Sequence, residues 1–422
     1  MLLWYLILAT FHVTVKSLQN NTVTSTTAIS IEPEDSFYPS LQWSDVFDWK
    51  VLTLLSQKSK NVLFSPASLK LVLVVLYEAS SGATKKDFED SLQFGSKEAI
   101  RQSIKEMIEA LHVNPTNENR LSLSTKIFLD SEVKIKDVFA QKVRTLYGID
   151  VESTNFSDTQ TTSDKINKWA SEFTMGEINR LTDPGDVQDM MLLLANAIYF
   201  KGVWRHQFLK NATFVSGFYN TPFSKIYIPY MTTTNKFYYF ESQLLEAKIL
   251  RMPYKNSQFS MFFLLPFSKG GLSTLIGKVD VPTLHREMHY MDKKDVLVTI
   301  PKFSFKLKAS YTDVLRQLGL QKIFQNSASF TGIAEGNNSI LRKLVVSDIL
   351  QSTAIDVDEE GSVAVAVTDV IIGNKIGVPE DVFNATHPFL FFIQDDNTGT
   401  VLFLGKVENP LYQELEIRKE KD

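Results

Sequence analysis

The apolar residues of this chain change their spacing about halfway along the sequence. In segments 43–55, 65–80 and 97–112 they recur every three or four residues, which predicts helices. After Asp189 they form short β-branched and aromatic runs instead, which predict strands. These runs are MLLLANAIYF, FSMFFLLPF, DVLVTIPKFSFKL, HPFLFFI and GTVLFLGKV. Because no linker rich in Pro or Gly separates the two halves, the order of helices and then strands predicts one α+β domain with a large core.

The composition is that of a globular protein without cysteine chemistry. Of the 422 residues, 44% are hydrophobic and 22% are charged, so the chain can bury a substantial core. The formal net charge of −4 gives no reason to expect nucleic acid as a partner. The sequence contains no Cys, which excludes a cysteine nucleophile, thiolate metal ligands and thiol redox chemistry.

The N-terminus predicts secretion. Residues 1–17 contain an apolar run that is short for a membrane span, so we interpret them as a signal peptide, with a signal anchor as the alternative. Residues 18–41 are rich in Thr, Ser and Asn without periodicity, which predicts a flexible polar tail. Five Asn-x-Ser/Thr sequons are candidate N-glycosylation sites, and they begin at Asn20, Asn155, Asn211, Asn337 and Asn384. Together these features predict an extracellular glycoprotein.

The sequence lacks the motifs of common enzyme and cofactor sites. It has no nucleophile elbow, Walker loop, dinucleotide fingerprint or zinc-protease helix motif. His285 and His289 have the spacing of two metal ligands on a helix, but no third candidate lies nearby. We therefore predict no catalytic residue, metal or cofactor. Lys97, Arg101 and Lys105 share one side of a predicted helix and form a candidate glycosaminoglycan surface, although interleaved glutamates favour an ordinary solvated face.

One strand-like segment also contains glycines, and a proline follows it, as in a loop. Residues 356–378 read DVDEEGSVAVAVTDVIIGNKIGV, and small residues alternate with valines in the middle of the segment. The small residues are Ser362, Ala364, Ala366 and Thr368. This alternation is typical of a half-buried strand, whereas the glycines and Pro379 favour a loop. The segment fits either an ordinary half-exposed strand or a long exposed loop that is able to form a strand.

Seven ordered motifs between residues 42 and 410 resemble the serpin family, whose inhibitory members trap serine proteases with a mobile reactive loop. The motifs are NVLFSPASL, LLLANAIYFKGVW, LRMPYKNSQFSMFFLLP, IPKFSFK, LVVSDILQSTAIDVDEEG, HPFLFFI and GTVLFLGKVENP. The resemblance implies a serpin domain over 42–410, with a charged C-terminal tail over 411–422. It also implies a large, mainly antiparallel sheet, surrounding helices and an exposed reactive loop at about 359–382.

The resemblance assigns a role to the strand-like segment. In inhibitory serpins the cleaved loop inserts into the main sheet as a new strand, and its inward face must be small because the interior is already densely packed. The alternating small residues would form that face. Glu359, Glu360 and Gly361 match the family's hinge, where glycine permits a large change of backbone conformation. Because no Pro, charge or bulk occupies an inward hinge position, retained inhibition is predicted.

The family register places the scissile bond between Lys375 and Ile376. Lys375 lies 14 residues beyond Gly361 and is the only basic residue between Gly361 and His387. A trypsin-like protease recognises Lys or Arg through a buried acid in its specificity pocket, so the predicted target belongs to this class. A displaced bond at Ile372 or Ile376 would instead indicate an elastase-like or chymotrypsin-like target.

Four further residues match a polar cluster that controls sheet opening in the family. Ser65, Ser68 and Asn196 match its members beneath the central strands, and Gln351 stands where a histidine is usual. An amide both donates and accepts hydrogen bonds, so we expect the network to persist with altered geometry. Ser65 also precedes Pro66, which predicts a helix N-cap.

Together these features predict a monomeric, secreted suicide inhibitor of an extracellular trypsin-like serine protease, with no enzymatic activity and no membrane partner. Two alternatives remain. The first is a non-inhibitory serpin that binds or carries another molecule or acts like a chaperone, which the small hinge residues oppose. The second is an intracellular serpin, which the signal segment and the sequons oppose.

Overall fold

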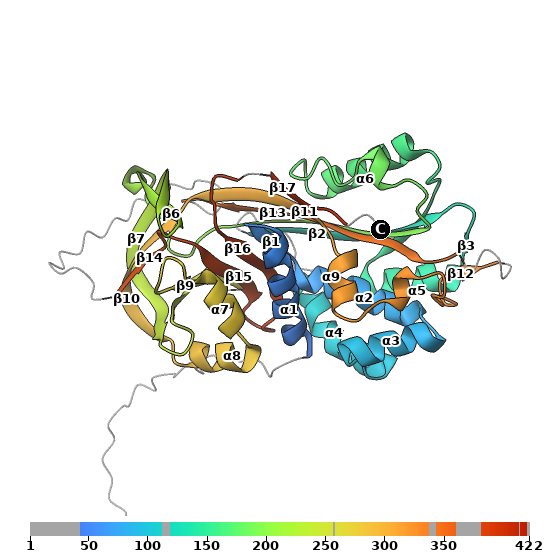
Figure 1. The fold of residues 1–422 in the computed structure, drawn as a ribbon, viewed down its shortest axis with the longest axis horizontal. Helices are drawn as coiled ribbons and strands as arrows, with labels where there is room; N and C mark the ends of the chain where they lie inside the picture. Colours follow the sequence, from blue (N-terminus) through green and yellow to red (C-terminus); the bar gives the residue numbers. More distant parts are fainter. Residues whose placement is uncertain are drawn as a thin grey trace, which may run out of the picture. The chain divides into compact units, whose positions relative to one another are not determined.

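The computed structural model describes residues 43–111, 119–255, 258–336, 343–359, 381–412 and 414–419. All of them belong to the unit Phe37–Asp422. The predicted signal peptide and polar tail lie outside the described residues. Figure 1 shows the elements of this unit, with α-helices and two main sheets packed on one another.

The helix α2 is the most deeply buried of the nine α-helices in the described ranges. It begins at Pro66 directly after Ser65, whose side chain accepts a hydrogen bond from the Ser68 amide, as in an ordinary N-cap. All 14 of its residues are buried, in agreement with the apolar run in the sequence. The helices are α1 (Trp43–Lys58), α2 (Pro66–Ala79), α3 (Gly82–Leu92), α4 (Lys97–Leu111), α5 (Asp137–Tyr147), α6 (Thr159–Phe173), α7 (Leu272–Lys278), α8 (Val281–His289) and α9 (Thr312–Gln317).

The larger sheet has nine strands in the described residues and is antiparallel apart from the pair of β10 and β14. Its order is β1-β16-β15-β9-β8-β7-β10-β14, and β6 also pairs with β7. β8 and β9 form the predicted middle hairpin. The strands are β1 (Val62–Phe64), β6 (Phe214–Thr221), β7 (Ser224–Ser242), β8 (Ala247–Pro253), β9 (Phe259–Pro266), β10 (Asp292–Pro301), β14 (Asp381–Asn384), β15 (Phe389–Asp395) and β16 (Val401–Val407).

The second sheet has six strands in the described residues, and its pairings are mixed. Its order is β17-β11-β13-β5-β2-β4. β13 and β5, at the centre, run parallel, as do β17 with β11 and β4 with β2. The strands are β2 (Asn119–Asp130), β4 (Asp150–Thr154), β5 (Leu192–Gly202), β11 (Phe303–Ser310), β13 (Val346–Val357) and β17 (Glu414–Ile417), and a short separate ladder joins β3 (Lys134–Ile135) to β12 (Ala334–Glu335).

The side chains of β5 alternate between two cores on opposite faces of the six-stranded sheet. Its odd-numbered residues from Leu193 to Tyr199 pack in the apolar cluster that contains Ile166 of α6. Its even-numbered apolar residues, such as Leu194 and Ile198, belong to the main core, which also contains α2. In Figure 1, α6 lies above this sheet and α2 lies below it. A strand has a period of two, so Asn196 faces the side of α2.

The observed architecture confirms the predicted α+β class, with the helical segments and the β-rich runs where the periodicity placed them. The nine-stranded sheet fits the expected antiparallel pairing, whereas the six-stranded sheet is mixed. The C-terminal tail contains the short strand β17, which the sequence analysis did not foresee. No helix in the parts of the chain that the structure describes is long and apolar enough to cross a membrane.

Candidate functional site

The predicted reactive loop begins where β13 ends. β13 stops at Val357, and the chain is described as far as Glu359 and again from Asp381. The other predicted loop residues lie outside the described residues, and these are Glu360, Gly361, Ser362, Ala364, Ala366, Thr368, Lys375 and Ile376. The structure therefore defines the two flanks between which the loop lies.

The side chain of Glu359 fixes the first flank. It is 5% exposed, and its carboxylate accepts hydrogen bonds from Thr213 Oγ1 at 2.7 Å and from Lys302 Nζ at 2.8 Å. Its carbonyl oxygen accepts a hydrogen bond from the Phe208 amide at 3.0 Å. Burial alone would raise the pKa of Glu359, but the bonds from Lys302 and Thr213 lower the pKa below its ordinary value. The predicted hinge glutamate is therefore held in its ionised form at the end of the strand.

Asp358, the residue before Glu359, is fixed by an aromatic pair and a lysine. Trp204 Nε1 donates a hydrogen bond to the Asp358 carbonyl oxygen at 2.9 Å, and the indole stacks on Tyr254 with 4.4 Å between ring centroids. Lys201 of β5 forms an ion pair with the Asp358 carboxylate at 3.5 Å. These contacts hold the ends of β5 and β13 together where the loop begins.

Gln351 connects the middle of β13 to the start of α2. Its Oε1 accepts hydrogen bonds from the Ser65 amide at 2.8 Å and from Tyr311 OH at 3.1 Å. Its Nε2 donates to the Ser65 carbonyl oxygen at 3.1 Å, and the Thr353 hydroxyl donates to Oε1 at 3.1 Å. All four residues are buried. The structure thus brings Ser65 and Gln351 together and adds Tyr311 and Thr353 to their network.

Asn196 lies on β5 in register with Gln351 on the neighbouring strand. Its Oδ1 accepts a hydrogen bond from Thr125 Oγ1 of β2 at 2.5 Å. The Nδ2 of Asn196 and the hydroxyl of Ser68 are buried and have no hydrogen-bond partner within the described residues. Buried donors without partners cost free energy, so this polar region stabilises the closed sheet less than a fully satisfied network would.

The second flank is fixed by a strand and a buried histidine. β14 pairs in parallel with β10, from Val296 opposite Asp381 to Thr299 opposite Asn384. Farther along, His387 is buried and its Nε2 lies 2.7 Å from the Pro266 carbonyl oxygen. A carbonyl oxygen only accepts hydrogen bonds, so Nε2 is the donor. Burial lowers the pKa of His387, which favours the neutral ring.

Three of the predicted glycosylation sites are accessible in the structure. The side chains of Asn155, Asn211 and Asn384 are exposed. Asn20 and Asn337 lie outside the described residues. Asn384 is the last residue of β14 and therefore lies in the second flank of the loop.

Two of the three basic residues of the candidate glycosaminoglycan surface contact Glu78 of α2. Lys97 Nζ donates to the Glu78 carbonyl oxygen at 2.6 Å, and the Arg101 guanidinium binds the Glu78 carboxylate through two nitrogens. Lys142 also donates to that carboxylate at 2.7 Å. Lys105 pairs with the exposed Glu109 at 3.9 Å. These contacts support an ordinary structural role for α4 rather than a polysaccharide surface.

β13, which leads into the predicted loop, pairs with β5 on one side and with β11 on the other. The parallel strands β5 and β13 pair directly, from Leu192 opposite Val346 to Phe200 opposite Ile355. Parallel strands have their carboxyl ends on the same side of a sheet, so the chain leaves β13 beside the carboxyl end of β5. A segment that turned back there would run antiparallel to both strands.

Among the described residues, no group of three or more His, Asp or Glu side chains could hold a metal ion.

A comparison with known protein families decides the identity of this fold. The sequence model of the serpins, which are serine protease inhibitors, matches residues 44–410. The chain belongs to the serpin family. It is 32% identical over 370 residues to serine protease inhibitor 2 of Anopheles gambiae, covering 86% of this chain and 90% of that protein. It is also 32% identical over 377 residues to plasminogen activator inhibitor 1 of Neovison vison, covering 86% and 91%.

Solved serpin structures share the fold of this chain. Serpin48 of the insect Tenebrio molitor is 28% identical with a TM-score of 0.77, covering 87% of this chain and 97% of that structure. Human thyroxine-binding globulin complexed with thyroxine is 25% identical with a TM-score of 0.78, covering 87% and 97%. Serpin-12 of Manduca sexta, at 23% identity and a TM-score of 0.80, supports the fold alone and covers 89% and 100%. The predicted serpin fold is confirmed, and relatives named as inhibitors support protease inhibition at the level of the family.

Sequence analysis missed several residues that fix the site of this serpin. Thr213 and Lys302 bind the hinge glutamate, Trp204 binds the preceding carbonyl group, and Tyr311 joins the network of Gln351. Two of them were visible inside quoted motifs: Trp204 ends LLLANAIYFKGVW, and Lys302 is the lysine of IPKFSFK. Thr213 and Tyr311 carry no comparable sequence signal.

Proposed function

We propose that this serpin is a secreted suicide inhibitor of trypsin-like serine proteases. The protease serine attacks the carbonyl carbon of Lys375, the amine of Ile376 leaves, and an acyl-enzyme forms. The loop then inserts between β5 and β13 before water releases the protease. The serpin supplies a substrate bond and a conformational change, and the catalytic residues belong to the protease.

The arrangement of β5 and β13 carries this proposal. The two strands are parallel neighbours, and the strand-forming segment leaves β13 at the edge of the sheet where both end. Insertion would replace one parallel pairing by two antiparallel pairings, which are slightly more stable per residue, and would add a second ladder of backbone hydrogen bonds. About 14 extended residues span roughly 45 Å, which is enough to carry a tethered protease across the domain.

The polar cluster lies across the seam that would open. Asn196 of β5 and Gln351 of β13 are in register on adjacent strands, so an inserted strand would separate them. We assign Ser65, Ser68, Asn196 and Gln351 to the control of this opening. Asn196 Nδ2 and the Ser68 hydroxyl have no hydrogen-bond partner among the residues that the structure describes, and this supports the assignment, because such groups lower the cost of separating the strands.

Trypsin is the probe that tests the mechanism. The purified serpin is incubated with trypsin and analysed by denaturing gel electrophoresis and mass spectrometry. We expect a covalent complex near the summed mass and a released peptide that begins at Ile376. Cleavage of the wild type at Lys375 with trypsin left fully active would contradict inhibition. Trapping of another protease after cleavage elsewhere in the loop would contradict the Lys375 assignment alone.

A matched pair of variants separates insertion from cleavage. Ala366→Glu places a long charged side chain on the inward face without creating a new trypsin site. Burial of an unpaired charge is costly, so cleavage at Lys375 without trapping is expected. Val367→Glu changes the neighbouring residue on the opposite face and is expected to retain trapping. Equal trapping by the two variants would contradict the assigned inward face.

Secretion is the second part of the proposal. It is supported by the apolar segment 1–17 and by exposed sequons at Asn155, Asn211 and Asn384. Expression in a secretory host is expected to yield protein in the medium that lacks the signal segment and shifts in mass after removal of N-glycans. Protein retained inside the cells with the segment uncleaved would contradict it.

A carrier function is the competing candidate. It is favoured by the similarity to human thyroxine-binding globulin, which is complexed with thyroxine in its structure. In a carrier the loop need not insert after cleavage. The trypsin experiment distinguishes the two candidates, because a carrier would release active trypsin.

A further inference from the structure

The C-terminal segment forms a strand beyond the family match, which ends at residue 410. β17 lies at one end of the six-stranded sheet and pairs in parallel with β11, from Glu414 opposite Lys306 to Ile417 opposite Ala309. Through this pairing, the end of the chain covers backbone groups of β11 that would otherwise form an open sheet edge.

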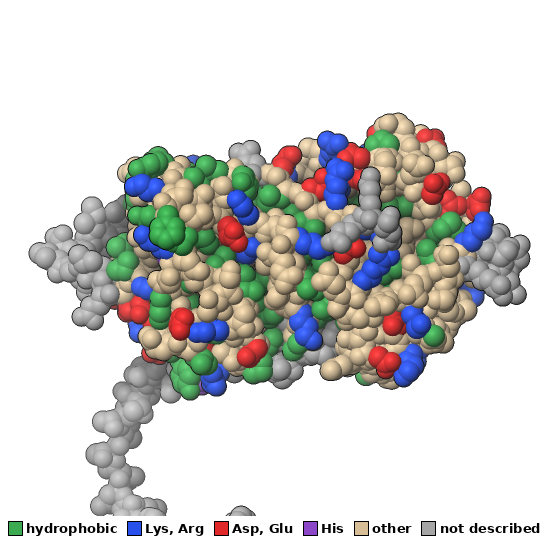
Figure 2. All heavy atoms as spheres, in the orientation of Figure 1, with side chains coloured by type: hydrophobic (Ala, Val, Ile, Leu, Met, Phe, Trp, Pro, Cys, Tyr) green, Lys and Arg blue, Asp and Glu red, His purple; other side chains and the backbone are tan. Residues whose placement is uncertain are grey.

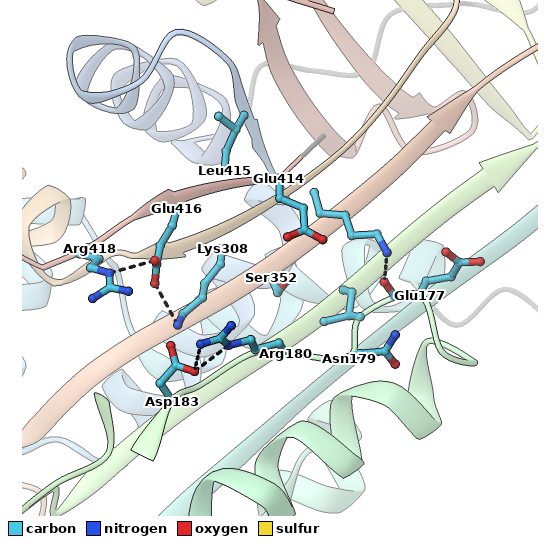
Figure 3. A pocket seen from close by; sticks show the side chains of 12 residues that line it. Glu177, Asn179, Arg180, Asp183, Lys308, Ser352, Glu414, Leu415, Glu416 and Arg418 are labelled. Atoms are coloured by element: carbon cyan, nitrogen blue, oxygen red, sulfur yellow. Dashed lines mark hydrogen bonds and ion pairs between the residues drawn. The ribbon is translucent and has the colours of Figure 1, made fainter. Parts of the chain in front are cut away.

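The residues of β17 alternate in step with those of β11. Leu415 packs against the main core, and Ile417 is buried at 6% exposure. Glu414 and Glu416 point to the opposite face, and Figure 3 shows Leu415 directed away from both glutamates. β11 reads Lys-Leu-Lys-Ala at the paired positions 306–309, so acidic residues lie opposite basic residues and apolar residues lie opposite apolar residues. A shift by one residue would reverse every pairing, so the register is specified.

Lys308 connects β17 to the segment that follows α6. Its Nζ lies 3.0 Å from Glu416 Oε1 and 2.7 Å from Asp186 Oδ2, in the short 3-10 helix η1 (Pro184–Asp186). Arg418 Nε lies 2.9 Å from Glu416 Oε2 (Figure 3). Burial alone would lower the pKa of Lys308, but the hydrogen bonds to Asp186 and Glu416 raise it. Glu416 is therefore recognised by a half-buried cation that the ion pair with Asp186 already orients.

A pocket lies beside β17. Its volume is about 380 Å³, and it is lined by residues of β17, β11, β13 and the segment after α6, including Arg180, Lys306, Ser352 and Glu414. Figure 2 shows that the charged side chains on this part of the surface are of both signs and lie side by side. β17 is thus held by one backbone ladder, two apolar side chains and an ion-paired glutamate, whereas the internal strand β13 has a ladder on both sides.

We propose that the outer edge of β11 is a strand-acceptor site for an extended peptide of alternating acidic and apolar residues, which the chain's own residues 414–417 occupy. Backbone hydrogen bonds supply affinity, as in other cases of strand addition. Lys308 selects an acidic residue at the position of Glu416, and Lys306 lies opposite the second acidic residue, Glu414. The occupied edge is closed to other chains, so the segment also protects the sheet against intermolecular strand pairing.

A labelled peptide of residues 411–422 tests this site on the full-length protein. The double variant Leu415→Asn/Ile417→Asn removes both apolar anchors and is expected to release the segment from the edge of β11. Fluorescence anisotropy is expected to show saturable binding of the peptide to this variant and none to the wild type, whose site is occupied. A control peptide with Glu414→Lys and Glu416→Lys is expected to bind about tenfold more weakly, because the ion pair of Lys308 with Glu416 is replaced by a like-charge contact and a lysine is placed opposite Lys306.

Hydrogen exchange of the wild type provides a test without substitution. The backbone amides of residues 414–417 that face β11 are expected to exchange slowly, as amides in a strand ladder do. Exchange at the rate of a free chain would overturn the proposal. Equal binding of the two peptides would overturn the charge selection, and self-association of the variant without peptide binding would overturn the preference for the acidic segment. None of these results depends on protease inhibition.

Discussion

Gln351 forms hydrogen bonds with buried polar groups of two other segments, so its loss is expected to reduce stability by more than one hydrogen bond is worth. Gln351→Leu keeps a similar volume but leaves both backbone groups of Ser65 and the Tyr311 hydroxyl without this partner. We expect the free energy of unfolding to fall by about 2 to 4 kcal/mol, because unsatisfied buried polar groups cost more than the mean hydrogen bond gains. Urea denaturation followed by tryptophan fluorescence measures this change.

Thr353→Val is the matched control for Gln351→Leu. It removes one donor to Gln351 Oε1 and leaves the bonds to Ser65 in place, so a loss of about 1 kcal/mol is expected. If Gln351→Leu were as stable as the wild type, the network would not contribute to the closed sheet.

Single residues could be predicted from the sequence where a local rule or a motif marked them. Ser65 was marked by the following proline, and Gln351 by its place in a motif. Thr213 and Glu359 are 146 residues apart, and nothing in either segment indicates that the hydroxyl meets the carboxylate. Contacts of this kind depend on how distant strands are brought together, which hydrophobic periodicity does not specify.

At the scale of elements, the junction between β13 and the loop depends on Glu359. Glu359→Gln keeps the shape of the side chain and removes its charge, so the bond from Lys302 loses its ionic component. Lys302 is 43% exposed, and solvent screening therefore limits the expected loss to about 1 kcal/mol. We expect a lower melting temperature and faster loop insertion than in the wild type, measured by thermal unfolding and by the rate of protease trapping.

The difference in stability between the wild type and Glu359→Gln depends on pH because the pKa of Glu359 is lowered in the folded state. A carboxyl group whose pKa is lower in the folded state adds stability above its unfolded pKa of about 4.3, and this stability is lost as the pH falls through the folded value. The gap in melting temperature between the wild type and Glu359→Gln should therefore be constant near neutral pH and close below about pH 4. A gap that persists in acid would indicate that the substitution acts through packing rather than charge.

Long elements were predicted and short ones were not. The apolar run of α2 and the apolar, aromatic-containing runs of β5 and β9 are long enough to be recognised in the sequence. β17 has four residues within a charged segment, and its strand conformation depends on pairing with β11, far upstream. A strand held by one partner and two apolar side chains carries too little local information to be recognised in advance.

At the scale of the whole molecule, the α+β class followed from the order of the hydrophobic patterns. The adjacency of β5 and β13 did not, because pairing between strands so far apart leaves no local signal. The serpin resemblance implied a main sheet that receives the loop but did not say which strands are neighbours. The structure shows that β5 and β13 are parallel neighbours with Asn196 and Gln351 in register. The proposed mechanism depends on this long-range arrangement, which neither strand specifies alone.

Cleavage of the loop is expected to stabilise the whole molecule if the loop inserts. A new strand of about 14 residues adds backbone hydrogen bonds worth about 0.5 to 1.5 kcal/mol each, on the order of 10 kcal/mol in total. For a domain of this size, such a gain raises the melting temperature by about 10 °C. Differential scanning calorimetry before and after nicking at Lys375 measures the shift, with Ala366→Glu as the nicked control in which insertion is blocked. An unchanged melting temperature in the nicked wild type would mean that the loop stays outside the sheet, and the carrier function would then be the better account of the same fold.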